Sequence, residues 1–226
     1  MSGDDPWEEG DSTMTPMATT VKSVRTATMN DVPGVARVLS RAFYNDPFFR
    51  WVFPDDNRRM GQTARAYALM AGFGSIPNGR TSVYESREEA ERAPVIRGAA
   101  LWTPPGVPGD SPSALLRSLP HWLQLVGLSR LPEIVRYLSE LKASAPEEAH
   151  WYLGVLGTDP VARGTGVGSR LLRAGLAQAD ADGVPVYLET MNSANIGYYE
   201  KYDFRVVRAI NDPSFPSTYC MLRPAV

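Results

Sequence analysis

The chain has 226 residues with 23 basic and 25 acidic side chains, and its formal net charge of -2 excludes a strongly basic nucleic-acid-binding protein. Its single cysteine, Cys220, excludes an intramolecular disulfide framework, and one cysteine with two histidines cannot complete a zinc site without carboxylates. No apolar run approaches the roughly 20 residues that span a membrane. We therefore expect a cytoplasmic protein without a metal, a membrane anchor or a nucleic-acid partner.

Charge is distributed unevenly along the chain. Residues 1–20 hold five acidic side chains and no lysine or arginine, so 21–226 carries 23 basic against 20 acidic residues, a charge of +3. The first segment is also rich in Ser, Thr, Pro and Gly, a composition typical of disorder. We expect a disordered acidic leader over 1–20 and one domain over 21–226.

In the first half of the chain, alternation predicts a strand at Val21–Thr28. Asn30-Asp31 can cap a helix that tolerates Pro33 in its first turn and runs to about Tyr44, where Asn45-Asp46-Pro47 breaks it. Apolar spacing and turn residues predict three further elements: a helix at Asp56–Phe73 and strands at Thr81–Glu85 and Val95–Thr103.

In the second half, helical spacing covers Ser113–Lys142 and is broken near Gly127 and Pro132. The elements expected after it are strands at His150–Thr158 and Val186–Thr190, helices at Gly166–Asp182 and Ala194–Tyr202, and closing strands at Phe204–Ile210 and Thr218–Leu222. The central β-α-β-α-β order favours one α+β or α/β domain with a mostly covered sheet.

A glycine loop at Gly164, Gly166 and Gly168 joins an expected strand to an expected helix. Without Cβ atoms, its backbone N–H groups can approach an anion, and the helix N-terminus adds partial positive charge. Three arginines lie nearby: Arg163, Arg170 and Arg173. The loop is a candidate diphosphate site, although a tight strand-to-helix connection would also use glycine.

Two other phosphate-binding motifs fit this loop poorly. A Walker A loop requires Gly-Lys-Ser/Thr, which the chain lacks. A dinucleotide fingerprint requires a third glycine where Ser169 stands, and the short remainder of the chain cannot supply the rest of a doubly wound fold, even though Glu189 is spaced like the ribose-binding acid.

After the next strand, Asn192, Asn195 and Tyr199 are spaced to share one helix face beside the glycine loop. These polar side chains could belong to the site at the glycine loop. Alternatively, they form a solvated polar face of the helix, while Tyr198 and Tyr202 pack in the core.

Several motifs together resemble the GNAT N-acetyltransferases. The run from Arg163 to Gly168 matches their (Gln/Arg)-x-x-Gly-x-(Gly/Ala) signature, and Tyr199–Phe204 resembles "Y-E-K-x-G-F" with Asp203 in place of glycine. The similarity extends over approximately Val24 to Arg223. The segments closer to the puromycin N-acetyltransferase branch are Ala100-Leu101-Trp102-Thr103-Pro104, Trp151-Tyr152-Leu153, Leu188-Glu189-Thr190 and Tyr219-Cys220-Met221.

This resemblance implies a mixed, largely antiparallel sheet covered by helices, whose fourth and fifth strands, His150–Thr158 and Val186–Thr190, splay apart to admit acetyl-CoA. The resemblance also implies which residues bind acetyl-CoA. Leu156, Gly157 and Thr158 would contact the pantetheine amides, and Asn195 would make a polar contact to the cofactor from the following helix. The pyrophosphate would be held by Arg163, Gly164, Thr165, Gly166, Val167, Gly168 and Ser169.

The resemblance further implies direct acetyl transfer in a ternary complex, with Tyr199 as general acid to the CoA thiolate. The base is left open between Glu189, His150 and water. Cys220 suggests an acyl-cysteine route, but without a matching His/Asp constellation a buried core position is favoured.

The implied acceptor is a primary amine of a small molecule, such as a puromycin-like aminonucleoside or another antibiotic. We expect its site among aromatic side chains, many of which must also belong to the core: Phe43, Tyr44, Phe48, Phe49, Trp51, Phe53, Trp102, Trp122 and Trp151. The alternative is a non-catalytic acetyl-CoA-binding module or sensor. Either would be a monomer or a homodimer.

Overall fold

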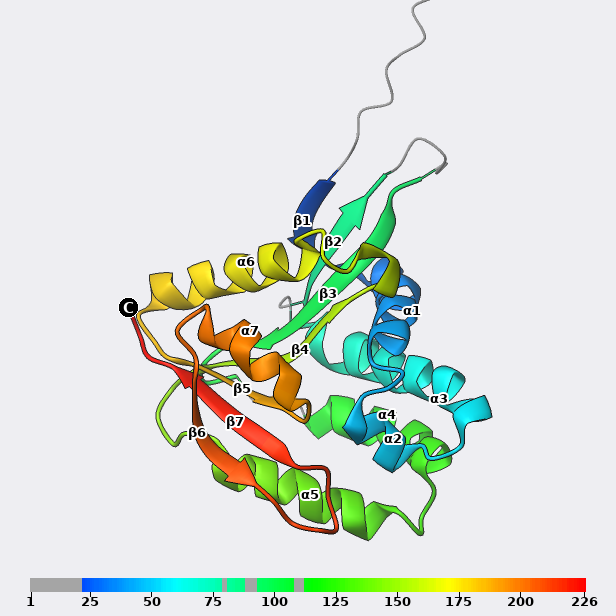
Figure 1. Ribbon diagram of the computed structural model, residues 1–226. Helices are drawn as coiled ribbons and strands as arrows, with labels where there is room; N and C mark the ends of the chain where they lie inside the picture. Colours follow the sequence, from blue (N-terminus) through cyan, green and yellow to red (C-terminus); the bar gives the residue numbers. More distant parts are fainter. Residues whose placement is uncertain (1–21, 79–80, 88–92, 108–111) are drawn as a thin grey trace, which may run out of the picture.

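A computed structural model describes residues 22–78, 81–87, 93–107 and 112–226, so the expected leader and Val21 lie outside the described residues. One seven-stranded sheet runs through this part of the chain in the order β1-β2-β3-β4-β5-β7-β6 (Figure 1). Neighbouring strands are antiparallel except β4 and β5, which are parallel, and the expected mixed, largely antiparallel sheet is confirmed. The strands are β1 Lys22–Thr26, β2 Thr81–Ser86, β3 Val95–Thr103, β4 Trp151–Thr158, β5 Val186–Thr190, β6 Arg205–Ile210 and β7 Thr218–Arg223.

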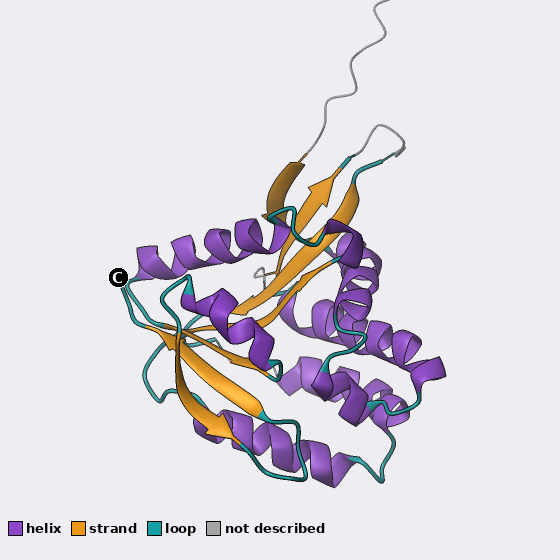
Figure 2. Cartoon of the chain, in the orientation of Figure 1, coloured by secondary structure: helices purple, strands orange, loops and turns teal. Residues whose placement is uncertain are grey.

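Helices cover both faces of the sheet (Figure 2). The helices are α1 Val32–Ala42, α2 Pro47–Val52, α3 Asp56–Leu69, α4 Pro112–Val126, α5 Leu131–Ser144, α6 Val167–Asp182 and α7 Ile196–Glu200. One buried cluster joins α1–α5 to one face through residues such as Leu39, Tyr67 and Val155. A second joins α6 and α7 to the other face through residues such as Leu171 and Phe204.

The structure adds a helix where the sequence predicted only a break. The chain does turn after α1, but α2 begins at Pro47, because proline is tolerated at the first helical position and Asp46 caps the helix. The Asp46 carboxylate accepts a hydrogen bond from the Phe48 backbone N–H at 2.9 Å. The helix expected at Asp56–Phe73 also changes character, since α3 passes into a π-helical segment at Met70–Ser75.

The parallel pair β4 and β5 separates soon after it forms, which confirms the expected splay. Pairing is confined to Trp151–Leu153 of β4 and Val186–Leu188 of β5. Directly beyond it, Leu101 and Trp102 of β3 pair with Val155 and Leu153, so Gly154 is the extra residue of a β-bulge. The bulge reverses the alternation of side chains: Leu153 packs beneath α6, whereas Val155 packs beneath α1. The end of β4 is therefore redirected at the point where the sheet opens.

Candidate active site

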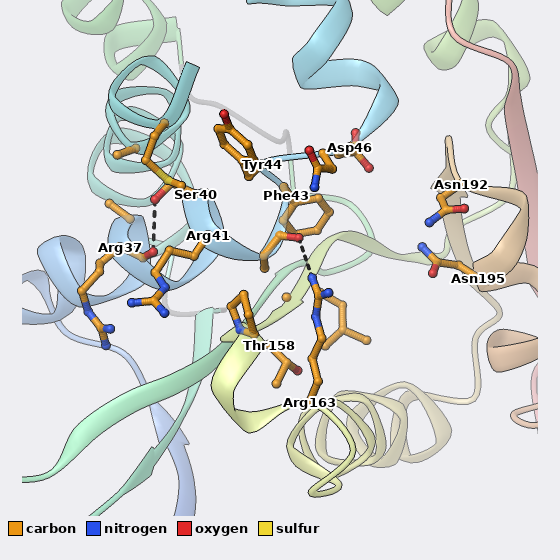
Figure 3. Close-up of a pocket in the computed structure, with 18 of the residues that line it drawn as sticks. Arg37, Ser40, Arg41, Phe43, Tyr44, Asp46, Thr158, Arg163, Asn192 and Asn195 are labelled. Atoms are coloured by element: carbon orange, nitrogen blue, oxygen red, sulfur yellow. Dashed lines mark hydrogen bonds between the residues drawn. The ribbon is translucent and has the colours of Figure 1, made fainter. Parts of the chain in front are cut away.

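Three cavities meet where β4 and β5 separate. The largest, about 1280 Å³, lies between α1, the α1–α2 connection and the end of β4 (Figure 3). A second, about 470 Å³, surrounds the start of α6. The third, about 190 Å³, lies between the α1–α2 connection, β4 and β5. Leu156 and Asn195 line all three cavities, so the three form one continuous candidate site.

The glycine loop forms one wall of the 470 Å³ cavity. Gly164 and Gly166 have φ of 79° and 83°, a backbone conformation that favours glycine, and Gly166 directly precedes α6. A Cβ on Gly168 would lie 3.3 Å from Thr158 Oγ1 and 3.4 Å from Tyr198 Oη, and so would narrow the cavity. The open floor and the first turn of a 16-residue helix suit a phosphate group.

This cavity is lined by most of the residues that were expected to bind the cofactor. They are Leu156, Thr158, Arg163, Gly164, Gly166, Val167, Gly168, Ser169 and Asn195. Two have other surroundings: the Thr165 hydroxyl donates to Ala162 O at 2.7 Å, and Gly157 lines the 1280 Å³ cavity. A Cβ on Gly157 would lie 2.5 Å from Leu39 Cδ2, so this glycine lets α1 pack closely on β4.

The three nearby arginines hold the loop and helix in place. Arg163 donates from Nη2 to Ala42 O at 3.1 Å, which ties the loop to the end of α1 (Figure 3). Arg170 donates from Nη1 to Thr165 O at 3.1 Å within the loop. Arg173 lies over the Tyr202 ring at 5.7 Å. Of the three, Arg163 lines both the 470 and the 1280 Å³ cavities.

Glu189 and Tyr199 line the 190 Å³ cavity together. Burial raises the pKa of the Glu189 carboxyl to about 7, while the Tyr152 and Tyr187 hydroxyl groups favour the charged form and oppose the rise. Burial also raises the pKa of the Tyr199 phenol, with a smaller contribution from Tyr198, so this phenol stays protonated at neutral pH. Tyr199 lines the 470 Å³ cavity as well and therefore stands between the glycine loop and Glu189.

Asp46 and Tyr198 are among the residues of the site that were not identified from the sequence. Asp46 lines both the 1280 and the 190 Å³ cavities, and burial raises its pKa to about 6. Its sequence signal, Asn45-Asp46-Pro47, is that of a helix break. Tyr198 was expected only as a core residue, yet its hydroxyl lies beside Gly168 on the 470 Å³ cavity.

Of three other candidates, two lie away from these cavities and one lines the 1280 Å³ cavity. His150 Nδ1 contacts Glu148 O at 2.7 Å, and its ring packs edge-on against Tyr187 at 5.7 Å. Cys220 is fully buried among residues that include Tyr187 and Ile210. Asn192 lines the 1280 Å³ cavity but caps the turn before α7 instead of lying on the helix.

The expected aromatic wall is correct only in part. Phe43, Phe48 and Phe49 line the 190 Å³ cavity, and Tyr44 lines the 1280 Å³ cavity. Trp102 and Trp151 were wrongly assigned to it, since both pack beneath α6 on the opposite face of the sheet. The remaining members, Trp51, Phe53 and Trp122, belong to the cluster of α1–α5.

Within the described ranges, no three His, Cys, Asp or Glu side chains are grouped so that they could hold a metal ion. None of the helices in these ranges combines the length and the apolar character needed to cross a bilayer.

Comparisons with known proteins agree with this geometry. The model of the acetyltransferase (GNAT) family matches residues 113–204. A crystal structure described as histone acetyltransferase HPA2 and related acetyltransferase, from Corynebacterium glutamicum, is 28% identical with a TM-score of 0.66, over 91% of this chain and 97% of that one. The chain is thus similar to the GNAT family over residues 113–204 and to a solved acetyltransferase over most of its length.

Two more distant structures share the fold. Arylalkylamine N-acetyltransferase 2 from Aedes aegypti is 12% identical with a TM-score of 0.58, over 90% of this chain and 98% of that one. Polyamine N-acetyltransferase from Drosophila melanogaster is 13% identical with a TM-score of 0.56, over 90% and 100%. The seven-stranded sheet with its splayed parallel pair is the GNAT fold.

Proposed function

We propose that the protein transfers an acetyl group from acetyl-CoA to a primary amine of a small molecule, directly and within a ternary complex. The observation that carries this proposal is the place of Tyr199, which lines both the cavity at the glycine loop and the cavity that contains Glu189. A proton donor and a proton acceptor thus face one space on either side of the opening in the sheet.

The residues at the opening fit CoA. The backbone N–H groups of 163–169 would hold the pyrophosphate, Leu156, Gly157 and Thr158 the pantetheine amides, and Asn195 the cofactor from the helical side. When bound, acetyl-CoA supplies an acetyl group activated as a thioester. The side chains around it position the acetyl group and exclude water.

Protons move between two residues in this mechanism. The amine nitrogen forms a bond to the acetyl carbon as the carbon–sulfur bond breaks, and Glu189 accepts the proton that the nitrogen loses. Tyr199 donates its phenolic proton to the departing sulfur. The products are an amide and a thiol, and solvent returns the proton from Glu189 to Tyr199 before the next turnover.

The sequence motifs favour an aminonucleoside or another antibiotic amine as acceptor, as in the puromycin N-acetyltransferase branch. Phe43, Phe48 and Phe49 in the 190 Å³ cavity would pack against an acceptor with a flat or apolar body. We propose a cytoplasmic enzyme, monomeric or homodimeric, with one catalytic domain over 21–226.

The phenol of Tyr199 provides the test of catalysis. Tyr199→Phe should lower kcat by about 100-fold or more, because it removes the general acid, and it should preserve CoA binding measured by calorimetry. Tyr202→Phe, on the same segment but outside the three cavities, is the matched control. Thiol release and product mass are measured with acetyl-CoA and a panel of primary amines that includes puromycin.

Two outcomes would contradict the proposal in different ways. Full activity in Tyr199→Phe would remove the phenol from the mechanism. A wild-type protein that binds CoA and acetylates no amine in the panel would instead be a non-catalytic binding module.

A further inference from the structure

Among the described residues, two carboxyl groups and no cationic side chain line the 190 Å³ cavity. Asp46 reaches it from the α1–α2 connection and Glu189 from β5. No Lys, Arg or His is among the residues that line it. The two acids thus belong to separate elements that enclose one space.

Neither carboxyl group is paired with a cationic side chain within the described parts of the chain. Asp46 is bonded by the backbone N–H groups of Phe48 and Phe49, which cap α2 but bring no formal charge. No ion pair of the described residues includes Asp46 or Glu189. Burial is the main cause of the raised pKa of the Tyr137 phenol, and Glu189 and Asp46 each raise this pKa further. Both carboxyl groups therefore act on the same neighbouring side chain.

The other walls make this arrangement costly without a ligand. They are largely apolar and include the aromatic side chains of Phe43, Phe49 and Tyr67. Buried carboxylates in proteins are normally paired or bonded to cations, because a low-polarity environment penalises an isolated charge. The Tyr152 and Tyr187 hydroxyl groups favour the charged form of the Glu189 carboxyl, but they bring no formal positive charge. Among the described residues, the two carboxyl groups therefore have hydrogen-bond partners but no counter-charge.

Asp46 also faces the larger cavity. Figure 3 shows it across an open space from Asn192 and Asn195, and all three line the 1280 Å³ cavity. A ligand that entered by this route would pass Asp46 before it reached Glu189, which lines only the inner of these two cavities.

We propose that the acceptor is a diamine, which places its reacting amine at Glu189 and its second, protonated amine against Asp46. This inference rests on the proposed acetyl transfer and specifies its substrate class. Glu189 takes the proton of the reacting nitrogen, whereas the ammonium at Asp46 keeps its own proton and fixes the orientation of the acceptor. Asp46 is then a specificity-determining residue that touches the substrate.

Pairs of amines that differ in one charge test this inference. The first pair is 1,4-diaminobutane and pentylamine, in which a methyl group replaces the second amine, and the second is 1,4-bis(aminomethyl)benzene and 4-methylbenzylamine. In the full-length wild-type protein, kcat/KM with acetyl-CoA should be at least about tenfold higher for the diamine of each pair, as expected for one ion pair formed away from water.

The substitution Asp46→Asn keeps a good helix cap and removes the charge. It should lower the preference for the diamine at least about tenfold, mainly through KM, because a bound ammonium loses its counter-charge. Asp55→Asn is the matched control: Asp55 caps α3 in the same way, through Asn57 N at 2.9 Å, and lines none of the three cavities. It should leave the preference unchanged.

Different experimental results would overturn the diamine inference and the proposed acetyl transfer. Equal kcat/KM for monoamine and diamine, or an equal loss for both in Asp46→Asn, overturns the diamine acceptor and leaves acetyl transfer standing. Absence of any acetylated product from these amines and from puromycin overturns the proposed function, and the inference with it.

Discussion

Burial acts on Tyr199 and Glu189 in the same direction but with different chemical results. It raises the pKa of the Tyr199 phenol, which therefore remains a proton donor throughout the neutral range. It raises the pKa of the Glu189 carboxyl to about 7, close to the pH at which a general base is most effective. One dry opening in the sheet thus prepares both an acid and a base.

The first prediction concerns the Glu189 carboxyl. In the wild type, kcat/KM should rise between about pH 6 and pH 8, because only the ionised carboxylate accepts a proton and its pKa lies near 7. Glu189→Gln should lower kcat/KM by about 100-fold or more and abolish this rise, the ascending limb of the pH profile. Rates with 1,4-diaminobutane are measured from pH 5.5 to 9. Glu200→Gln, an exposed residue of α7, is the control, and a limb that survives in Glu189→Gln would assign the base elsewhere.

A single residue also explains how an atypical motif keeps its turn. Asp203, which stands where the family segment has glycine, has φ of 67°. Aspartate tolerates this left-handed conformation better than most residues, and the turn is closed by a bond from Asp203 N to Glu200 O at 3.1 Å. The substitution therefore preserves the placement of Tyr199.

At the scale of elements, two glycines set how closely α6 approaches the sheet. A Cβ on Gly98 of β3 would lie 2.6 Å from Val167 Cγ1 at the start of α6, and a Cβ on Gly175 would overlap the Trp102 indole. The position of the glycine loop follows from this contact, because Val167 lies between Gly166 and Gly168 and is the first residue of α6. Packing on one face of the sheet thus positions the cavity at its edge.

Gly175→Ala should therefore destabilise the protein. Alanine normally stabilises a helix interior by about 1 kcal/mol relative to glycine, but overpacking against Trp102 costs about 1–3 kcal/mol and outweighs that gain. Gly61→Ala in α3 is the matched control, because a Cβ there would meet nothing within 4 Å, and it should be stabilising. Urea unfolding measures both changes, and an equal gain in stability for the two variants would refute this account of the packing.

At the scale of the whole molecule, the amino-acid sequence predicts the features that short segments encode. The strands, the long helices and the glycine loop follow from local spacing, and the mixed, largely antiparallel sheet with its splayed pair of strands followed from the family resemblance. Asp46 was missed because 143 positions separate it from Glu189 in the sequence, and the two meet only because α1 packs on β4 at Gly157. Trp102 and Trp151 were placed on the wrong face because composition does not reveal which side of a strand is lined, and a bulge such as Gly154 resets the alternation.

The free energy of unfolding of the whole molecule should decrease as pH rises from about 5 to 8. Folding raises the pKa of Glu189 from 4.5 to about 7 and that of Asp46 from 3.8 to about 6, so the native state binds more protons than the unfolded chain over this range. Their contribution is fully present below the unfolded pKa values and is lost as pH rises through the folded ones.

Asp31 acts in the opposite direction, because its hydrogen bonds to Arg25 lower its pKa to about 2, and its contribution is lost only as pH falls below about 4. The free energy of unfolding should thus be greatest near pH 4 to 5. It is measured by urea unfolding at pH 5 and pH 8, where we expect a difference of at least about 1 kcal/mol from Glu189. Glu189→Gln, which does not titrate, should reduce this difference, and an unchanged difference would show that the buried carboxyl is not its source.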